Sequence, residues 1–584
     1  MFKVTIHEIN DNPVLVFIVL LVFHLFIATS LFLISNSEFL SSQHYGNGFW
    51  RFASDSIIYH NEAIDSLAFL EKSQWGLWWN AYSSHAQVKY ISLIYWLIGH
   101  ENLLIIELIN GPVWVISIIV VFRSAQIMFN NNPLIPFITT IFFLQPSVLI
   151  HSTQLLRDPF VLLGVCFMCY GWILLNKTNF HLKAVLYIVI GSLFFVSMKP
   201  YLSQLLLICF GSYLFYALFS KDISIKNVLI LIVTILVITS NNISHIKGNI
   251  FYFFNNSSKI DVQTSKENLI IVKDFHKTIH AQTGIDVGEI SQNLIGSRVN
   301  FDLDLLSELF YSPLEINQID NSISEKNKLE IKSLLTLMKE INNIYVNPIA
   351  ETIRPAQVYE LAVLNYHLGY IEKFKESFYH ANSKKLTFEN RDVLELSILI
   401  PDNYQLILSR LEFLTENEQK WKSKNKISKF LDLGFWRLME FRAGSFYDVD
   451  SKNSKIDVNL SFNTFKDGLA YLPRAVQIAF LSPFPIDWLK EGYTTGRMGR
   501  IIAGLETLAL YAVLFGFMFV IFTNFKVLKP LIPILILSGS VMVLTAYAMP
   551  NLGTIYRFRM DLIIPFIIVG IYGLNLIIIG FLKK

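Results

Sequence analysis

The chain contains many apolar runs of about 20 residues, the length that an α-helix needs to cross the hydrocarbon core of a bilayer. The first, residues 13–35, is too long for the core of a signal peptide, and no small-residue cleavage site follows it, so we expect it to be retained. The other candidates are 102–127, 134–151, 158–176, 183–198, 201–219, 226–242, 500–524, 528–549 and 560–581. They predict an α-helical polytopic membrane protein with about ten transmembrane helices, and an ambiguous segment at 471–489 leaves that count open.

The composition agrees with a membrane protein. Only 16% of the residues are charged, against about 25% in a typical soluble domain, and 53% are hydrophobic. The formal net charge of +3 is too small to indicate a nucleic-acid partner. Cys166, Cys169 and Cys209 all lie inside apolar runs, so we expect small buried hydrophobic residues there, not disulfides or a zinc site.

The apolar runs divide the chain into three parts. An N-terminal transmembrane module covers 1–242 and includes a long loop at 36–101, which is rich in the tryptophan and tyrosine that favour membrane interfaces. We expect this loop to carry helices lying on the membrane surface, because its apolar run at 90–99 is too short to cross. A soluble, mostly helical insert covers 243–470, and a C-terminal transmembrane module covers 471–584.

Positive charge predicts the orientation. Alternate connections carry Lys3, Arg123, Lys177 with Lys183, Lys221 with Lys226, Lys526 with Lys529, and Lys583 with Lys584. All of them fall on one side if both termini are cytoplasmic. The loop 36–101 and the insert 243–470 would then lie outside the inner (plasma) membrane. The Lys-, Asn- and Ile-rich composition suggests a bacterium, so that this outer compartment is the periplasm or the cell surface.

Four cations break the charge rule, because they fall at the outer ends of the expected helices. They are Arg157, Lys199, Arg557 and Arg559. Cations gathered at one membrane level suggest a shared anionic ligand. The alternative is that their long side chains simply reach the interface as anchors.

The first outer loop contains an unusual concentration of ionisable residues in the stretch Asp55-Ser56-Ile57-Ile58-Tyr59-His60-Asn61-Glu62-Ala63. In a helix, Asp55, Tyr59 and Glu62 share one face. A polar, ionisable face beside a bilayer suggests a functional surface. The alternative is a solvated amphipathic helix that lies on the membrane.

Five segments together resemble the membrane-embedded GT-C glycosyltransferases, in particular the bacterial family 39-like branch related to protein mannosyltransferases and lipid A aminoarabinose transferases. The segments are Asp55-Ser56 with Tyr59-His60; Tyr95-Trp96-Leu97-Ile98-Gly99 with Asn102-Leu103; Gln145-Pro146-Ser147 through Leu155-Leu156-Arg157-Asp158; Met198-Lys199-Pro200; and Tyr556-Arg557-Phe558-Arg559 with Pro565. The resemblance covers roughly 1–240 and 470–584 and implies a GT-C-like bundle. It leaves most of the 243–470 insert without an assigned role.

The resemblance implies transfer of a sugar from a polyprenyl-phosphate carrier to a glycan, lipid or protein acceptor on the outer side. Asp55 would then be the catalytic base of an inverting reaction, and the phosphate would be bound by Arg157, Lys199, Arg557 and Arg559. The better-studied mannosyltransferases of this superfamily carry an Asp-Glu pair where this chain has Asp55-Ser56. Asp158 and Glu62 are therefore candidates for the second acid, and a requirement for a divalent metal stays open.

Other roles remain open for two of these residues. Asp158 could orient Arg157, bind the sugar or bind a metal, or it could form a structural ion pair with its neighbour. His60 could contact the acceptor, the donor or an ion, or it could be an ordinary interfacial histidine.

Two other classes of function compete with a transferase. One is a polysaccharide polymerase or ligase of the O-antigen type, which would carry catalytic arginine or histidine motifs in its long outer loop. The other is a lipid-linked glycan transporter or flippase, which tends to show internal repeats and helices broken near the membrane centre. No nucleotide-binding glycine loop is evident, which agrees with a lipid-linked donor.

Overall fold

The computed structural model describes residues 12–82, 85–129, 132, 134–177, 182–219, 232, 416, 423–444, 454–457, 460, 462–492 and 495–582. The chain forms two compact units. Unit 1 comprises Met1–Ile250, Asp450–Val458 and Tyr471–Lys584, and unit 2 comprises Phe251–Val449 and Asn459–Ala470. The expected span at 226–242 and most of the expected insert at 243–470 lie outside the described residues.

The described part of unit 1 is mostly helical. The helices that correspond to expected spans are α2 (Pro13–Ser35), α6 (Glu107–Met128), α7 (Leu134–Ile141), α8 (Pro146–Ser152), α9 (Asp158–Lys177), α10 (Leu182–Met198), α11 (Ser203–Phe219), α24 (Gly496–Thr523), α25 (Ile532–Ala548) and α27 (Ile564–Leu582). A shorter helix, α26 (Leu552–Leu562), lies between α25 and α27.

Among the described residues, six helical segments are long and apolar enough to cross a membrane. The number rises to seven if the pair α7 and α8 is one span, bent by 61° at its break. Two shorter apolar helices, Leu182–Met198 and Pro200–Ser212, match two further expected spans in position. The chain is therefore a multi-pass membrane protein.

Glycine allows two pairs of spanning helices to pack with their backbones in close approach. A Cβ atom added at Gly191 of α10 would lie 2.6 Å from the Gly164 carbonyl of α9. A Cβ atom at Gly573 of α27 would lie 1.9 Å from the Gly516 carbonyl of α24. Small residues at such crossings are typical of membrane helices, because lipid offers no hydrophobic gain and close van der Waals contact must stabilise the pair.

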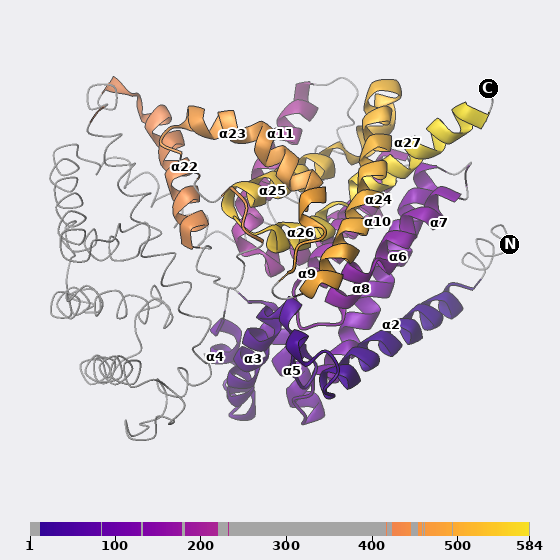
Figure 1. Ribbon diagram of the computed structural model, residues 1–584, viewed down its shortest axis with the longest axis vertical. Coiled ribbons are helices and arrows are strands. Elements are labelled where there is room, and N and C mark those ends of the chain that lie inside the picture. The colour runs from indigo at the N-terminus through magenta and orange to yellow at the C-terminus, as the bar shows by residue number, and fades with distance from the viewer. Residues whose placement is uncertain are drawn as a thin grey trace. The chain divides into compact units, whose positions relative to one another are not determined.

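The loop after α2 forms a small helical layer. It contains η1 (Ser41–Gln43), β1 (His44–Gly46), β2 (Phe49–Trp50), η2 (Arg51–Ala53), α3 (Asp55–Glu71), α4 (Trp75–Asn80), α5 (Gln87–Ile98) and η3 (Leu103–Ile106). One face of α3, including Tyr59, Ala63 and Leu67, packs with Ile91 and Tyr95 of α5 in a common core. Figure 1 shows α3, α4 and α5 together, near the end of α2 and far from the end of α27.

The described part of unit 2 contains α22 (Lys426–Gly444) and the first residues of α23 (Phe465–Leu481), whose remainder from Tyr471 belongs to unit 1. The buried Asp432 carboxylate of α22 accepts a hydrogen bond from the Phe465 amide at 2.7 Å, and Lys424 pairs with it at 2.5 Å. This contact holds the start of α23 against α22 within unit 2. The short helices η4 (Phe142–Leu144), η5 (Pro200–Leu202), η10 (Pro485–Asp487) and η11 (Phe525–Leu531) complete the described structure.

Candidate functional site

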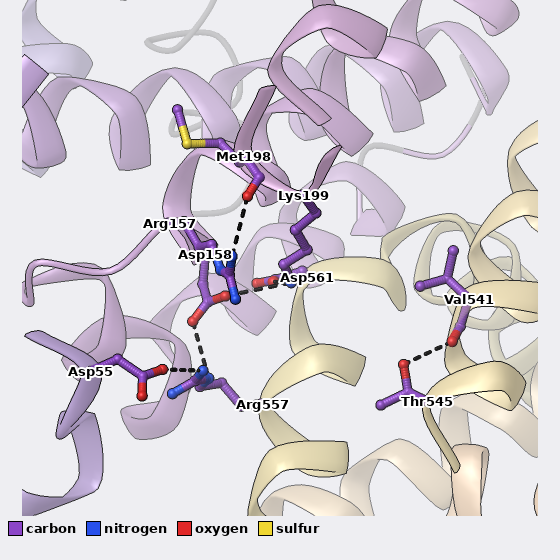
Figure 2. A network of polar contacts seen from close by, with 9 residues as sticks. All are labelled: Asp55, Arg157, Asp158, Met198, Lys199, Val541, Thr545, Arg557 and Asp561. Atoms are coloured by element: carbon purple, nitrogen blue, oxygen red, sulfur yellow. Dashed lines mark hydrogen bonds and ion pairs between the residues drawn. The ribbon is translucent and has the colours of Figure 1, made fainter. Parts of the chain in front are cut away.

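Charged side chains from four separate parts of unit 1 form one cluster of alternating sign. Its members are Asp55 of α3, Asp158 of α9, Lys199 between α10 and η5, and Arg557 and Asp561 of α26. Figure 2 shows the carboxylates and cations directed toward one another, with Arg157 beside them. We call these five residues the charge chain.

Three residues of the charge chain lie at helix ends, and the local sequence explains why the helices begin or end there. Asp55 and Asp158 are each the first residue of a helix, where the positive end of the helix dipole favours an acidic side chain. Lys199 precedes Pro200, which disfavours helical backbone at the residue before it. Lys199 accordingly leaves α10 with φ −132° and ψ 71°.

Arg557 is the centre of the charge chain, because its guanidinium contacts two acids at once. Its Nη2 donates a hydrogen bond to Asp55 Oδ2 at 2.7 Å, and its Nε lies 3.2 Å from Asp158 Oδ2. Burial lowers the pKa of Arg557, but Asp158 and Asp55 outweigh burial, and its pKa is raised overall. The Asp158 side chain is 5% exposed, whereas that of Asp55 is 33% exposed, so Asp55 is the acid that an outside molecule can reach.

Lys199 continues the charge chain deeper into the protein. Its Nζ lies 3.2 Å from Asp561 Oδ2 and 3.5 Å from Asp158 Oδ1. The ammonium also lies 3.7 Å from the centre of the Phe558 ring. The side chain is only 1% exposed, so protein groups enclose the charge that we expected to meet a donor phosphate.

Arg157 is the cation with the weakest contacts in the cluster. Its Nη1 donates to the Met198 carbonyl at 3.5 Å, and its guanidinium lies 5.9 Å from the centre of the exposed Tyr201 ring. Its Nε is buried and has no hydrogen-bond partner within the described part of the chain. Arg157 therefore retains donor capacity that an anion could use.

Tyr59 lies close enough to this cluster for its charges to affect the pKa of the Tyr59 hydroxyl. Burial raises the pKa of Tyr59 to about 12, against the opposing influence of Arg157. Its hydroxyl therefore stays protonated at neutral pH and cannot replace a carboxylate as a base.

Two predicted site residues of α3, Glu62 and His60, lie outside the charge chain. Glu62 Oε2 pairs with His85 Nδ1 at 2.6 Å, and His60 Nδ1 lies 2.9 Å from the Tyr95 hydroxyl. Burial lowers the pKa of His60, which favours its neutral form. Both residues therefore have partners within the α3–α5 layer.

Arg559 also lies away from the charge chain, although it is only two residues from Arg557. Its guanidinium donates to the Phe480 carbonyl at 3.0 Å, to the Ser482 carbonyl, and to Thr507 Oγ1 at 3.3 Å. These carbonyls belong to the end of α23, and Arg559 is 2% exposed. The structure thus gives Arg559 a capping contact where we predicted a phosphate ligand.

Asp561 is the member of the charge chain that the sequence analysis did not select. It falls inside the apolar run expected to span the membrane at 560–581. An acidic residue within such a run was itself a signal, because an ionisable group in an apolar segment needs a partner. That partner is Lys199, 362 residues earlier in the chain.

A second polar cluster anchors the middle of α26 at Tyr556. Glu506 of α24 accepts hydrogen bonds from the Ser147 amide at 3.0 Å, from Ser147 Oγ at 2.5 Å and from the Tyr556 hydroxyl. Tyr556 immediately precedes Arg557, so these bonds tie the backbone beside Arg557 to α8 and α24. The orientation of Arg557 thus depends on packing among several spanning helices.

The acids of the charge chain do not form a fitting site for a divalent metal. Arg557 and Lys199 already occupy the space between Asp55, Asp158 and Asp561, and a metal cation there would be repelled by both. Elsewhere in the described ranges, no group of three or more His, Cys, Asp or Glu side chains is arranged to hold a metal. We therefore assign no step to a metal.

Comparison with models of known protein families, with curated proteins and with solved structures finds no match to this chain.

Proposed function

We propose that this protein is an integral-membrane glycosyltransferase of the GT-C type, which moves a sugar from a polyprenyl-phosphate carrier to an acceptor on the outer side of the membrane. The observation that carries the proposal is the bridge from Asp55 through Arg557 to Asp158. It combines a reachable carboxylate with fixed cations, which are the two elements that transfer from a lipid phosphate requires. A glycan, a lipid or a protein could supply the acceptor hydroxyl.

Asp55 is the base in this proposal. One of its oxygens accepts from Arg557, and the partial exposure of the side chain leaves room for an acceptor hydroxyl. The acceptor oxygen bonds to the sugar carbon while its proton passes to the Asp55 carboxylate. The bond from that carbon to the phosphate oxygen breaks on the opposite face, and its electron pair leaves with the polyprenyl phosphate, so the configuration inverts.

Arg157 is the main ligand of the donor phosphate in this proposal. It has a free buried Nε and one long hydrogen bond, whereas Arg557 and Lys199 are held by carboxylates. The phosphate gains negative charge as the sugar leaves, so a nearby fixed guanidinium stabilises the transition state more than the bound donor. The prenyl tail would lie against the apolar surface of the spanning helices.

A transporter or flippase is the second candidate, and a separate observation favours it. His24 of α2 and Glu107 of α6 are buried in spanning helices, with His24 Nδ1 3.1 Å from Glu107 Oε2. Ionisable pairs at such positions often belong to transport pathways. A polymerase or ligase of the O-antigen type remains the third.

We predict that Asp55→Asn lowers kcat by about 10²–10⁴-fold, because the amide cannot take the acceptor proton. The assay is release of polyprenyl phosphate from a panel of polyprenyl-phosphate sugars, with a crude acceptor extract and purified protein in nanodiscs. Asp65→Asn is the matched control, since Asp65 lies on the same helix and its contact is the Tyr82 hydroxyl. Equal turnover by wild type and Asp55→Asn would remove Asp55 from the mechanism. No turnover by wild type, with normal lipid binding, would favour the transporter or polymerase.

We predict that Arg157→Gln lowers kcat/KM for the lipid donor by about 10–100-fold, the value of one charge-assisted hydrogen bond, through a lower kcat and a higher donor KM. The acceptor KM should stay nearly unchanged. Arg51→Gln is the control, because Arg51 also stacks on a tyrosine, Tyr45, in the outer loop. An unchanged kcat/KM for the donor in Arg157→Gln would assign the phosphate to other groups.

A further inference from the structure

The buried pair of Lys199 and Asp561 adjoins the proposed site at Asp158, and the proposed mechanism uses neither residue. Lys199 is 1% exposed and the Asp561 side chain 6% exposed. Burying an ion pair is seldom a gain in stability over apolar residues of similar size. Stability alone therefore does not explain why the pair is buried next to Asp158.

The geometry shows two cations that share one carboxylate. Arg557 Nε lies 3.2 Å from Asp158 Oδ2, while Lys199 Nζ lies 3.5 Å from Asp158 Oδ1. Lys199 has a closer partner, Asp561, at 3.2 Å. Asp561 thus draws Lys199 away from Asp158, and Asp158 remains available to Arg557.

We propose that Asp561 is a positioning residue. By holding Lys199, it keeps Asp158 paired with Arg557, and this pairing keeps Arg557 against Asp55. The inference rests on the proposed function where it concerns catalysis, but the arrangement of the four contacts stands on the structure alone.

Arg557 and Lys199 compete for the Asp158 carboxylate. Without the Asp561 carboxylate, Lys199 is a buried charge with one remaining acid, and it closes on Asp158. The contact between Arg557 Nε and Asp158 then weakens. Because that contact fixes the orientation of the guanidinium, the hydrogen bond from Nη2 to Asp55 becomes less well held. Removal of the Lys199 charge in the same molecule ends the competition, so the second substitution should repair the first.

The experiment compares wild type with Asp561→Asn, Lys199→Met and the double variant in nanodiscs. Asp487→Asn, Lys490→Met and their double form the control cycle, because Asp487 and Lys490 are an ion pair at 2.7 Å outside the charge chain. The first readout is the rate at which a water-soluble carbodiimide and an amine label Asp55, measured by peptide mass spectrometry. The second is kcat and donor KM for release of polyprenyl phosphate.

We expect Asp561→Asn to raise the labelling rate of Asp55 at least threefold and to lower kcat about tenfold, with donor KM changed less than twofold. The double variant should return both quantities to within about threefold of wild type. The control variants should change neither the labelling rate of Asp55 nor kcat. A merely structural role for Asp561 predicts a lower thermal unfolding midpoint in Asp561→Asn, with the labelling rate of Asp55 in the folded protein unchanged.

The outcomes separate this inference from the proposed function. Unchanged Asp55 labelling in Asp561→Asn, or a double variant no better than Asp561→Asn, would overturn the positioning role whatever the turnover. If wild type releases no polyprenyl phosphate but the labelling rises and is repaired as expected, the proposed function fails and the positioning of Asp55 by Asp561 stands.

Discussion

Arg557→Met is expected to reduce sugar transfer by more than about 10³-fold, a loss within the range expected for removal of the Asp55 base. The substitution removes the guanidinium that holds Asp55 in place. It also leaves Lys199 as the remaining cation paired with Asp158. We also expect the free energy of unfolding to fall by up to about 3 kcal/mol, at the lower end for a broken buried pair, because Asp158 keeps Lys199 as a partner. Polyprenyl-phosphate release measures the first effect, and unfolding by SDS titration measures the second.

Arg557→Lys separates charge from geometry in the same experiment. A lysine ammonium keeps the charge but cannot reach both acids with the planar fork of arginine, so we expect a loss intermediate between wild type and Arg557→Met. The control is Arg497→Met, since Arg497 is exposed at the start of α24. Wild-type turnover in Arg557→Met would rule out the bridge from Asp55 to Asp158 as the basis of the activity.

Gly573→Leu is expected to cause the largest loss of stability. A Cβ atom at this position would lie 1.9 Å from the Gly516 carbonyl and 2.5 Å from its carbonyl carbon, so α24 and α27 would have to separate. Backbone displacement in a packed region costs about 1–3 kcal/mol or more, and here it also disturbs Glu506 on α24, which anchors Tyr556 beside Arg557. We therefore expect a large fall in the thermal unfolding midpoint together with loss of turnover.

The same helix supplies the control for this prediction. Gly580 of α27 has no atom within 4 Å of an added Cβ, so Gly580→Leu should leave both stability and turnover near wild type. A midpoint that falls equally in both variants would attribute the effect to leucine in α27 in general. A midpoint unchanged in Gly573→Leu would show that α24 and α27 do not depend on the close crossing.

The sequence predicted well where the signal is local. Helix length and apolarity belong to consecutive residues, so the runs beginning at 13, 102, 158, 500 and 528 correspond to helices of the structure within a few residues. The break between α7 and α8 falls inside the expected run at 134–151, where Pro146 begins α8. Residues 226–242 and most of 243–470 lie outside the described part of the chain, so the full set of about ten crossings stays a prediction.

The sequence selected several charged residues that the structure brings into contact, but it could not assign their partners. It selected Asp55, Asp158, Lys199 and Arg557, which the structure brings together, and it selected Arg157 beside them. It gave the same role to Arg559, which instead caps the end of α23 through carbonyl groups. Arg557 and Arg559 are two residues apart on one helix, so their side chains point in different directions and meet different surroundings.

By itself, the sequence determined that this protein crosses the membrane repeatedly and carries cations and acids at helix ends, because burial in lipid depends on the composition of each segment. Only the tertiary structure decided which charges meet, since the contact between Asp55 and Arg557 joins residues 502 positions apart. Pairing of that kind depends on how closely helices approach, as at Gly516 with Gly573, and Coulomb attraction then depends on a few ångströms of separation. The same packing brought Asp561 beside Lys199, a pairing that no local pattern in the chain indicates.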